Sequence, residues 1–426
     1  MIVYYKRMKK LLLVIVLILA AFGSGFGVKS IWKQNKPEVK SETKDVYTGF
    51  ALEIWDKVKE NYWEKITDDD LSNIYLLAVD KLSGVSHGLI SRNRSGVERL
   101  LTDVNKDVGA DKKKEFYVTL GDMVLANLKP FGRSRLYAQK DEKALSQVVN
   151  NIDPGSDHLN TLGISKNATD QQVLEAFKEK TKEATTEAKK AEVKKAYEVL
   201  KDSTSRQNYE LAGVEPTIDY EQLSSTIFWV HLTKFSPNSL DEFVRVMDKA
   251  DKTTTLDTLI FDLRGNIGGA IDQLPYFLGP FIGMDTYAYQ FYHQGEKEDF
   301  KTKTGWLNSL VRYKKVVILI DENAQSTAEV MAATLKKYNV GVVLGTTTKG
   351  WGTVERVIPM DHQIASDEKY SIYLVHRVTL RDDGQPIEGL GVEPQISIKN
   401  PNWKKELLQR FNDQGIVRAV EEIYKR

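Results

Sequence analysis

The stretch VVILIDENAQSTAEVMAATLKKYNVGVVLGTTTKGWGTVE, residues 316–355, decides the fold. Val316 to Ile320 is an apolar run that predicts a buried strand, and the pattern from about Ser326 to Tyr338 is helical. Asn339 to Leu344 is a second apolar run. Because short loops between such elements make the strands parallel, the stretch predicts the strand, helix, strand unit of an α/β fold.

Ser326 occupies the turn between the predicted strand and the predicted helix. A hydroxyl at that place is exposed at the carboxyl end of a sheet and lies close to the free amides of a helix N-terminus, where an oxyanion can be stabilised. The same residues fit a capping box, in which Ser326 accepts from the Glu329 amide and the Glu329 side chain reaches back. Local sequence therefore leaves both a nucleophile and a helix cap open.

Three segments together resemble the carboxy-terminal processing (tail-specific) serine proteases, peptidase family S41. Residues 323–329, NAQSTAE, resemble the family's nucleophile segment, with Ser326 three residues before the glutamate. Residues 262–269, DLRGNIGG, closely resemble its D-L-R-x-N-x-G-G, and residues 383–394 resemble its closing G-x-x-I-x-x-x-G-[IV]-x-P-D, with Gln395 in place of the final aspartate. The resemblance covers about 170 residues, 227–396, and implies an α/β S41 (ClpP/crotonase-like) protease core.

The resemblance also implies a set of site residues. Ser326 would be the nucleophile of a serine endopeptidase that acts on carboxy-terminal regions of its substrates, without a cofactor. Glycines after a strand let backbone amides approach a reacting carbonyl. Either Gly268 or Gly269, together with the Thr327 amide, would therefore form the oxyanion hole.

The segment that should carry the general base departs from the family pattern. Residues 345–355 resemble G-E-x-T-[FY]-G-K-G-x-V-Q, but the position of the family's lysine is Trp351. Indole nitrogen is a donor only, so Trp351 cannot accept the serine proton. Lys349 stands where the family has Phe or Tyr, so lysine and aromatic have exchanged places.

A displaced lysine is one way to retain a Ser-Lys dyad. Lys349 would share a face with residue 351 in an extended segment, about 6 to 7 Å away, and neighbouring glycines would permit a local shift. The amine of such a base must be neutral, which a low-dielectric pocket promotes. His293, His362 and His376 are alternative bases, and a catalytically inactive pseudoprotease that binds peptides or envelope partners is the alternative function.

Length and composition limit the remaining possibilities. The 426 residues predict two or three domains, with the protease-like core at 217–400 and an amphipathic helix at 401–426. The net charge of +1 argues against nucleic acid as a partner. The chain has no cysteine, which excludes disulfides and a thiol nucleophile, and no H-E-x-x-H spacing, which argues against a zinc protease.

The N-terminus carries the signature of a membrane segment. A basic tail, residues 1–10, precedes an uncharged run at 11–28, which is about long enough to span a bilayer as a helix. The tail should stay in the cytoplasm, and the polar residues 29–48 should tether an extracytoplasmic body to this single-pass anchor. A cleaved signal peptide is the alternative for 11–28.

Residues 49–159 predict a helical N-terminal region, in kind like that of the same family. Asp153-Pro154-Gly155-Ser156 is a partial counterpart of the family's D-P-H-S motif, or an ordinary Pro-Gly turn. The family usually carries a PDZ domain after this point.

Residues 160–212 resemble a degenerate J-domain in place of that PDZ domain. Thr169 or Asp170 would cap its second helix, and Phe177 and Tyr197 would pack within a helical hairpin. The His-Pro-Asp loop of J-domains is absent, so an Hsp70 partner is not expected. A charged hairpin that serves as a spacer or docking surface is the interpretation we prefer.

Overall fold

The computed structural model describes residues 45–253 and 255–425. The predicted cytoplasmic tail, the anchor or signal at 11–28 and most of the tether lie outside these residues. Among the described residues, none of the helices combines the length and the apolar composition that a membrane span requires.

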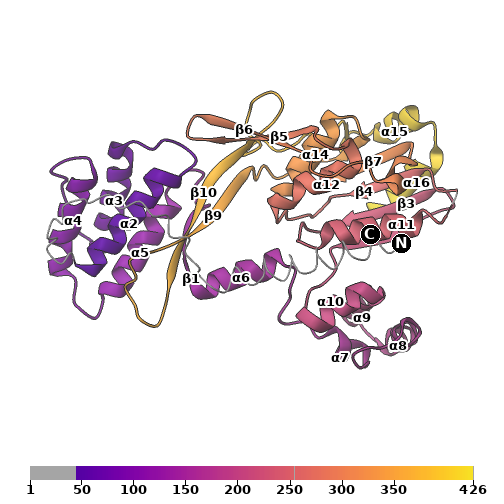
Figure 1. Ribbon diagram of the computed structural model, residues 1–426, viewed down its shortest axis with the longest axis horizontal. Coiled ribbons are helices and arrows are strands. Elements are labelled where there is room, and N and C mark those ends of the chain that lie inside the picture. Colours follow the sequence, from indigo (N-terminus) through magenta and orange to yellow (C-terminus); the bar gives the residue numbers. More distant parts are fainter. Residues whose placement is uncertain (1–44, 254, 426) are drawn as a thin grey trace, which may run out of the picture. The chain divides into compact units, whose positions relative to one another are not determined.

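A six-stranded sheet forms the centre of the α/β core (Figure 1), in the order β11-β8-β7-β4-β3-β2. All neighbours from β11 to β3 are parallel, and only β2 runs antiparallel to β3. The order confirms the predicted parallel crossover around Ser326, since β7 and β8 are neighbours. The strands are β2 Ile218–Gln222, β3 Ile227–Leu232, β4 Thr258–Asp262, β7 Lys315–Ile320, β8 Val342–Gly345 and β11 Ile396–Ser397.

Helices cover both faces of this sheet, because its strands are apolar on both sides. Alternate side chains such as Leu259 and Phe261 pack under α11, α12 and α14, whereas Ile260 and Leu319 pack under α15 and α16. The helices are α11 Ser239–Ala250, α12 Leu274–Ile282, α14 Thr327–Lys337, α15 Trp403–Phe411 and α16 Gln414–Ile423, with the short η1 Ile271–Gln273 and α13 Asn308–Val311.

The single C-terminal helix predicted for 401–426 is wrong. Asn412 has a φ of 49°, a left-handed conformation that ends α15, and the Asp413 side chain accepts from the Gly415 amide to begin α16.

A second, antiparallel sheet is built around the long strand β10, Tyr370–Leu380. Its partners are β1 Arg135–Ala138, β9 Thr353–Pro359 and β5 Tyr287–His293, and β5 continues to β6 Glu296–Lys301. Strand β1 lies within the region predicted to be helical, so that prediction is wrong for residues 135–138. Its pairing with residues 370–373, including a stack of Tyr137 on Tyr373, is a long-range contact without a local signal.

The N-terminal region is otherwise helical, as predicted. Four helices share a hydrophobic core with residues of β9 and β10, including Ile358 and Ile372. A fifth helix, α6, leads from β1 toward residue 150. The helices are α2 Val46–Asn61, α3 Asp68–Ser83, α4 Arg94–Asp107, α5 Lys113–Ala126 and α6 Gln139–Val149.

Residues 158–212 form a small helical module with its own core. Thr169 caps its second helix, as predicted, and the Phe177 and Tyr197 rings stack 4.2 Å apart. Asp153 to Ser156 form a turn, in which the Gly155 amide donates to the Asp153 carboxylate. The relation to J-domains stays a prediction. The helices are α7 His158–Leu162, α8 Asp170–Glu183, α9 Glu187–Leu200 and α10 Ser203–Ala212.

Candidate active site

Two loops meet at the carboxyl end of the parallel sheet. One follows β7 and carries Ser326, and the other follows β4 and carries the glycines. The Asp321 carboxylate accepts from the Gly265 amide at 2.8 Å, and the Gln325 amide donates to the Asn266 carbonyl oxygen at 2.9 Å. These bonds tie the predicted nucleophile to the predicted oxyanion segment.

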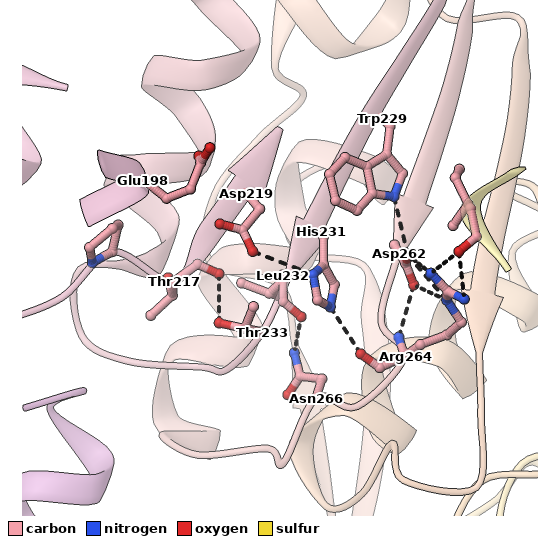
Figure 2. Close-up of polar contacts among 12 residues, drawn as sticks. Glu198, Thr217, Asp219, Trp229, His231, Leu232, Thr233, Asp262, Arg264 and Asn266 are labelled. Carbon is pink, nitrogen blue, oxygen red and sulfur yellow. Dashed lines mark hydrogen bonds and ion pairs between the residues drawn. The ribbon is translucent and has the colours of Figure 1, made fainter. Parts of the chain in front are cut away.

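The second loop is itself held rigidly (Figure 2). The Asp262 carboxylate accepts from the Trp229 indole at 3.1 Å and from the Arg264 guanidinium at 2.7 Å. The His231 ring lies 2.9 Å from the Arg264 carbonyl oxygen, and the Asn266 side-chain amide donates to the Leu232 carbonyl oxygen at 2.7 Å. The D-L-R-x-N residues therefore act as a buried frame that sets the path of the chain toward the glycines.

Ser326 has φ 57° and ψ −125°, a conformation that a non-glycine residue rarely adopts. The Glu329 amide donates to the Ser326 carbonyl oxygen at 2.8 Å, and the Ser326 side chain forms no cap hydrogen bond. The hydroxyl half of the predicted capping box is therefore not formed, whereas the Glu329 side chain reaches back to the Ser326 amide at 2.9 Å, as predicted. A sharp, strained turn from strand to helix that presents a serine hydroxyl is the geometry of a nucleophile elbow.

Glu329 joins the nucleophile turn to the loop of residues 348–351. Its carboxylate accepts from the Ser326 amide at 2.9 Å, the Gly350 amide at 2.7 Å, the Trp351 amide at 2.7 Å and the Thr348 hydroxyl. The side chain is fully buried. Burial raises the pKa of this carboxyl above its usual range, although the four hydrogen bonds oppose that shift.

The amides of Gly269 and Thr327 are free at the place where the sequence predicts an oxyanion hole. Within the described part of the chain, neither amide donates a hydrogen bond, whereas the Gly268 amide donates to the Asn266 side chain at 2.8 Å. A Cβ atom on Gly268 would lie 2.7 Å from the Ser326 Cβ, so this glycine is needed for close approach. Of the two predicted glycines, therefore, only Gly269 has a free amide, and Gly268 allows the close approach to Ser326.

The predicted base segment does not place a lysine in a pocket. The Lys349 side chain is exposed, and its Nζ lies 5.3 Å from the centroid of the Trp351 ring. Gly350, with φ 77°, interrupts the extended segment that the sequence predicted for residues 349–351. The Arg133 guanidinium lies 3.5 Å from the same ring centroid, so the indole binds a second cation.

The three histidines predicted as alternative bases contact other groups. His362 pairs with Glu53 at 2.9 Å, and the His293 and His376 rings lie 4.4 Å apart beside strand β10. None of these histidines lines the cavity beside Ser326. Among the described residues, no group of three or more metal-ligating side chains is placed to hold a metal ion.

A cavity of about 160 Å³ opens beside Ser326. Most of its wall is apolar, and helix α6 contributes two of the side chains. A larger cavity of about 400 Å³ contains none of the predicted site residues. The cavity beside Ser326 is lined by Leu145, Val149, Gly269, Ile271, Ser326, Thr327, Val330, Trp351, Thr353, Val354, Glu355, Val357, Tyr373 and Thr379.

Comparison with known proteins agrees with this geometry. The model of peptidase family S41 matches residues 226–398. These residues form a peptidase family S41 domain. The S41 domain accounts for both loops of the site and for the strand and helix unit that presents Ser326.

Curated relatives of the S41 domain are carboxy-terminal processing proteases. A probable CtpA-like serine protease of Staphylococcus epidermidis is 29% identical over 188 residues, which are 44% of this chain and 36% of the relative. The carboxy-terminal processing proteases CtpB and CtpA of Bacillus subtilis are 27% and 28% identical over 42% and 44% of this chain. The chain therefore spans little more than a third of the length of these relatives.

A solved structure of a photosystem II D1 C-terminal processing protease is 15% identical, with a TM-score of 0.49 over 83% of this chain and 93% of that chain.

Sequence analysis missed one ionisable side chain of the S41 domain. Glu355 lines the cavity of Ser326, where its carboxylate accepts from the Trp351 indole at 3.3 Å and from the Thr353 hydroxyl. The available signal was its position, four residues after Trp351, where the family pattern ends in glutamine.

Proposed function

We propose that this chain is a serine endopeptidase that cleaves extracytoplasmic proteins near their carboxy termini, with Ser326 as its nucleophile. The observation that carries the proposal is the strained backbone of Ser326, whose uncapped hydroxyl lies beside the free amides of Gly269 and Thr327. Relatives of the S41 domain carry the same activity in their names, which supports the reaction class.

The geometry supports acyl transfer. The Ser326 oxygen attacks a peptide carbonyl, and the negative charge that develops on the carbonyl oxygen is stabilised by the Gly269 and Thr327 amides. Such donors act strongly because they are fixed before the reaction begins. Lys349, the base predicted from the sequence, is exposed and does not line the cavity beside Ser326, so this geometry gives it no part in the reaction.

The cavity beside Ser326 indicates which substrate side chain is accepted. Its volume of about 160 Å³ is close to that of an engineered cavity of about 150 Å³ that binds benzene. Apolar side chains such as Ile271, Val330 and Val357 line most of it. The residue before the cleaved bond should therefore be apolar and no larger than phenylalanine.

We expect the full-length chain to cleave an unfolded protein with an apolar carboxy-terminal tail, and to release fragments from that end. Replacing the leucine before the cleaved bond by aspartate should lower kcat/KM by at least about tenfold, because it would bring a second carboxylate close to that of Glu355 in a mostly apolar cavity. Mass spectrometry of the fragments and initial rates on matched peptides measure both effects. Equal rates for the two peptides would contradict the assigned cavity, and an absence of fragments would contradict the proposed function.

Membrane attachment is part of the proposal and rests on the sequence of residues 1–48. An uncleaved anchor predicts that the full-length protein stays with membranes after alkaline washing and is digested by a protease added outside intact cells. Recovery in the soluble fraction would contradict the anchor.

A further inference from the structure

The cavity beside Ser326 contains a proton acceptor other than lysine. Of the described residues that line it, only Glu355 and Tyr373 titrate. Burial, above all, and the neighbouring Glu355 carboxylate raise the pKa of the Tyr373 hydroxyl, which keeps it protonated. Glu355 therefore carries the one carboxylate among the described residues on this wall.

A chain of hydrogen bonds connects Glu355 to the nucleophile turn through Trp351, which occupies the position of the family's lysine. One Glu329 oxygen accepts from the amides of both Ser326 and Trp351, so the backbones of these residues lie side by side. The Trp351 side chain then extends from this point and donates its indole hydrogen to Glu355. Trp351 thus holds a carboxylate on the wall of the cavity that Ser326 also lines, although it is not a base itself.

Resting on the proposed peptidase activity, we propose that Glu355 is the general base that accepts the proton of Ser326. The cavity of about 160 Å³ is large enough for a few water molecules or one substrate side chain. Because Ser326 and Glu355 line the same cavity, the proton passes between them inside it, directly or through one water molecule, which is the reach that general bases use.

The reaction balances with this single acceptor. The Ser326 O–H bond breaks as the proton moves to Glu355, and the serine oxygen bonds to the peptide carbonyl carbon. The carbonyl electron pair becomes the oxyanion at Gly269 and Thr327. When the oxyanion collapses, the C–N bond breaks and protonated Glu355 returns the proton to the leaving amine. Water then attacks the ester carbonyl and gives its proton to Glu355; as the ester C–O bond breaks, Glu355 returns that proton to the Ser326 oxygen.

The electrostatics of the site suit this role. Burial raises the pKa of Glu355 above its ordinary value of 4.5, against the hydrogen bonds from Thr353 and Trp351. A general base is most effective when its pKa approaches the working pH. Because the carboxylate must be ionised to act, activity should rise with pH through this raised pKa.

Glu355→Gln removes the base and keeps the hydrogen bonds of the side chain, so it separates a catalytic effect from a structural one. The glutamine oxygen still accepts from Trp351 and Thr353, whereas the base is lost. With the full-length protein in detergent and a fluorogenic peptide with leucine before the cleaved bond, kcat should fall by at least about 100-fold while KM changes little. Lys349→Met should leave kcat, KM and the pH profile unchanged.

The pH profile separates a base from a structural residue. Wild-type kcat/KM should rise through one ionisation above pH 4.5, and Glu355→Gln should lose that dependence. If Glu355→Gln does not fold, as judged by thermal melting, Glu355→Asp takes its place and should keep the pH dependence at a lower kcat. Wild-type rates in Glu355→Gln, loss of activity in Lys349→Met, or a pH-independent Glu355→Asp would overturn the assignment.

Ser326→Ala distinguishes this proposal from the one on which it rests. If Ser326→Ala hydrolyses the peptide at the wild-type rate, both the peptidase proposal and the role of Glu355 are wrong. If Ser326→Ala is inactive and Glu355→Gln is fully active, only the role of Glu355 is wrong.

Discussion

Ser326→Ala is expected to lower peptide hydrolysis by at least about a thousandfold, since loss of a catalytic nucleophile removes the covalent route. The substitution removes one oxygen and leaves Glu329 able to accept from the backbone amide of residue 326. Folding should therefore be preserved. Initial rates at saturating peptide measure the loss, and the melting temperature verifies the fold.

Ser224→Ala is the matched control for this experiment. Ser224 is exposed in the turn between β2 and β3, and its hydroxyl accepts only from amides of that turn, at Thr226 and Ile227, besides a contact to the Thr226 hydroxyl. Its activity should match that of the wild type. Residual hydrolysis in Ser326→Ala at a tenth of the wild-type rate or more would assign the reaction to another residue.

Glu329→Gln is expected to lower both activity and stability. The amide nitrogen of glutamine is a donor, and either carboxylate oxygen that it replaces accepts from at least one backbone amide, Ser326 and Trp351 on one side or Gly350 on the other. Each buried donor without a partner costs about 1–3 kcal/mol, which predicts a loss of at least about 1–3 kcal/mol in the free energy of unfolding. Misplacement of the nucleophile by about 1 Å should reduce kcat by about 100-fold.

Urea unfolding of the full-length protein measures the stability change, with Glu393→Gln as the control. Glu393 is exposed, so its substitution should change the free energy of unfolding by less than about 0.5 kcal/mol. A Glu329→Gln protein as stable as the control would show that the four hydrogen bonds of the carboxylate are not structural.

The parallel core was predictable because its signals are local. Apolar runs mark β7 and β8, and helical periodicity marks α14 between them. The strand β1 was not predictable, because its four residues become a strand only through pairing with residues 370–373. The break at Asn412 was missed for a different reason, since the amphipathic pattern continues across it and a left-handed asparagine is tolerated.

The sequence predicted which residues form the candidate site, but not how their backbones and amides are arranged. Motif spacing identified Ser326 and the pair Gly268 and Gly269, yet it could not show that the Gly268 amide is already bound to Asn266. It also could not separate a helix cap from a nucleophile, because that difference lies in the φ and ψ angles of Ser326. Glu355 was missed because the family pattern has a lysine as its base, so Lys349, two residues before Trp351, was the expected substitute.

The reactivity of the Ser326 hydroxyl is the central claim, and covalent labelling tests it most directly. A peptidyl phosphonate ester with leucine at the reactive end is incubated with the full-length protein, and the modified residue is identified by tandem mass spectrometry. We expect one adduct, on Ser326, which forms in the Ser224→Ala protein and not in the Ser326→Ala protein. An unmodified Ser326, with the adduct on another residue or no adduct at all, would contradict the account.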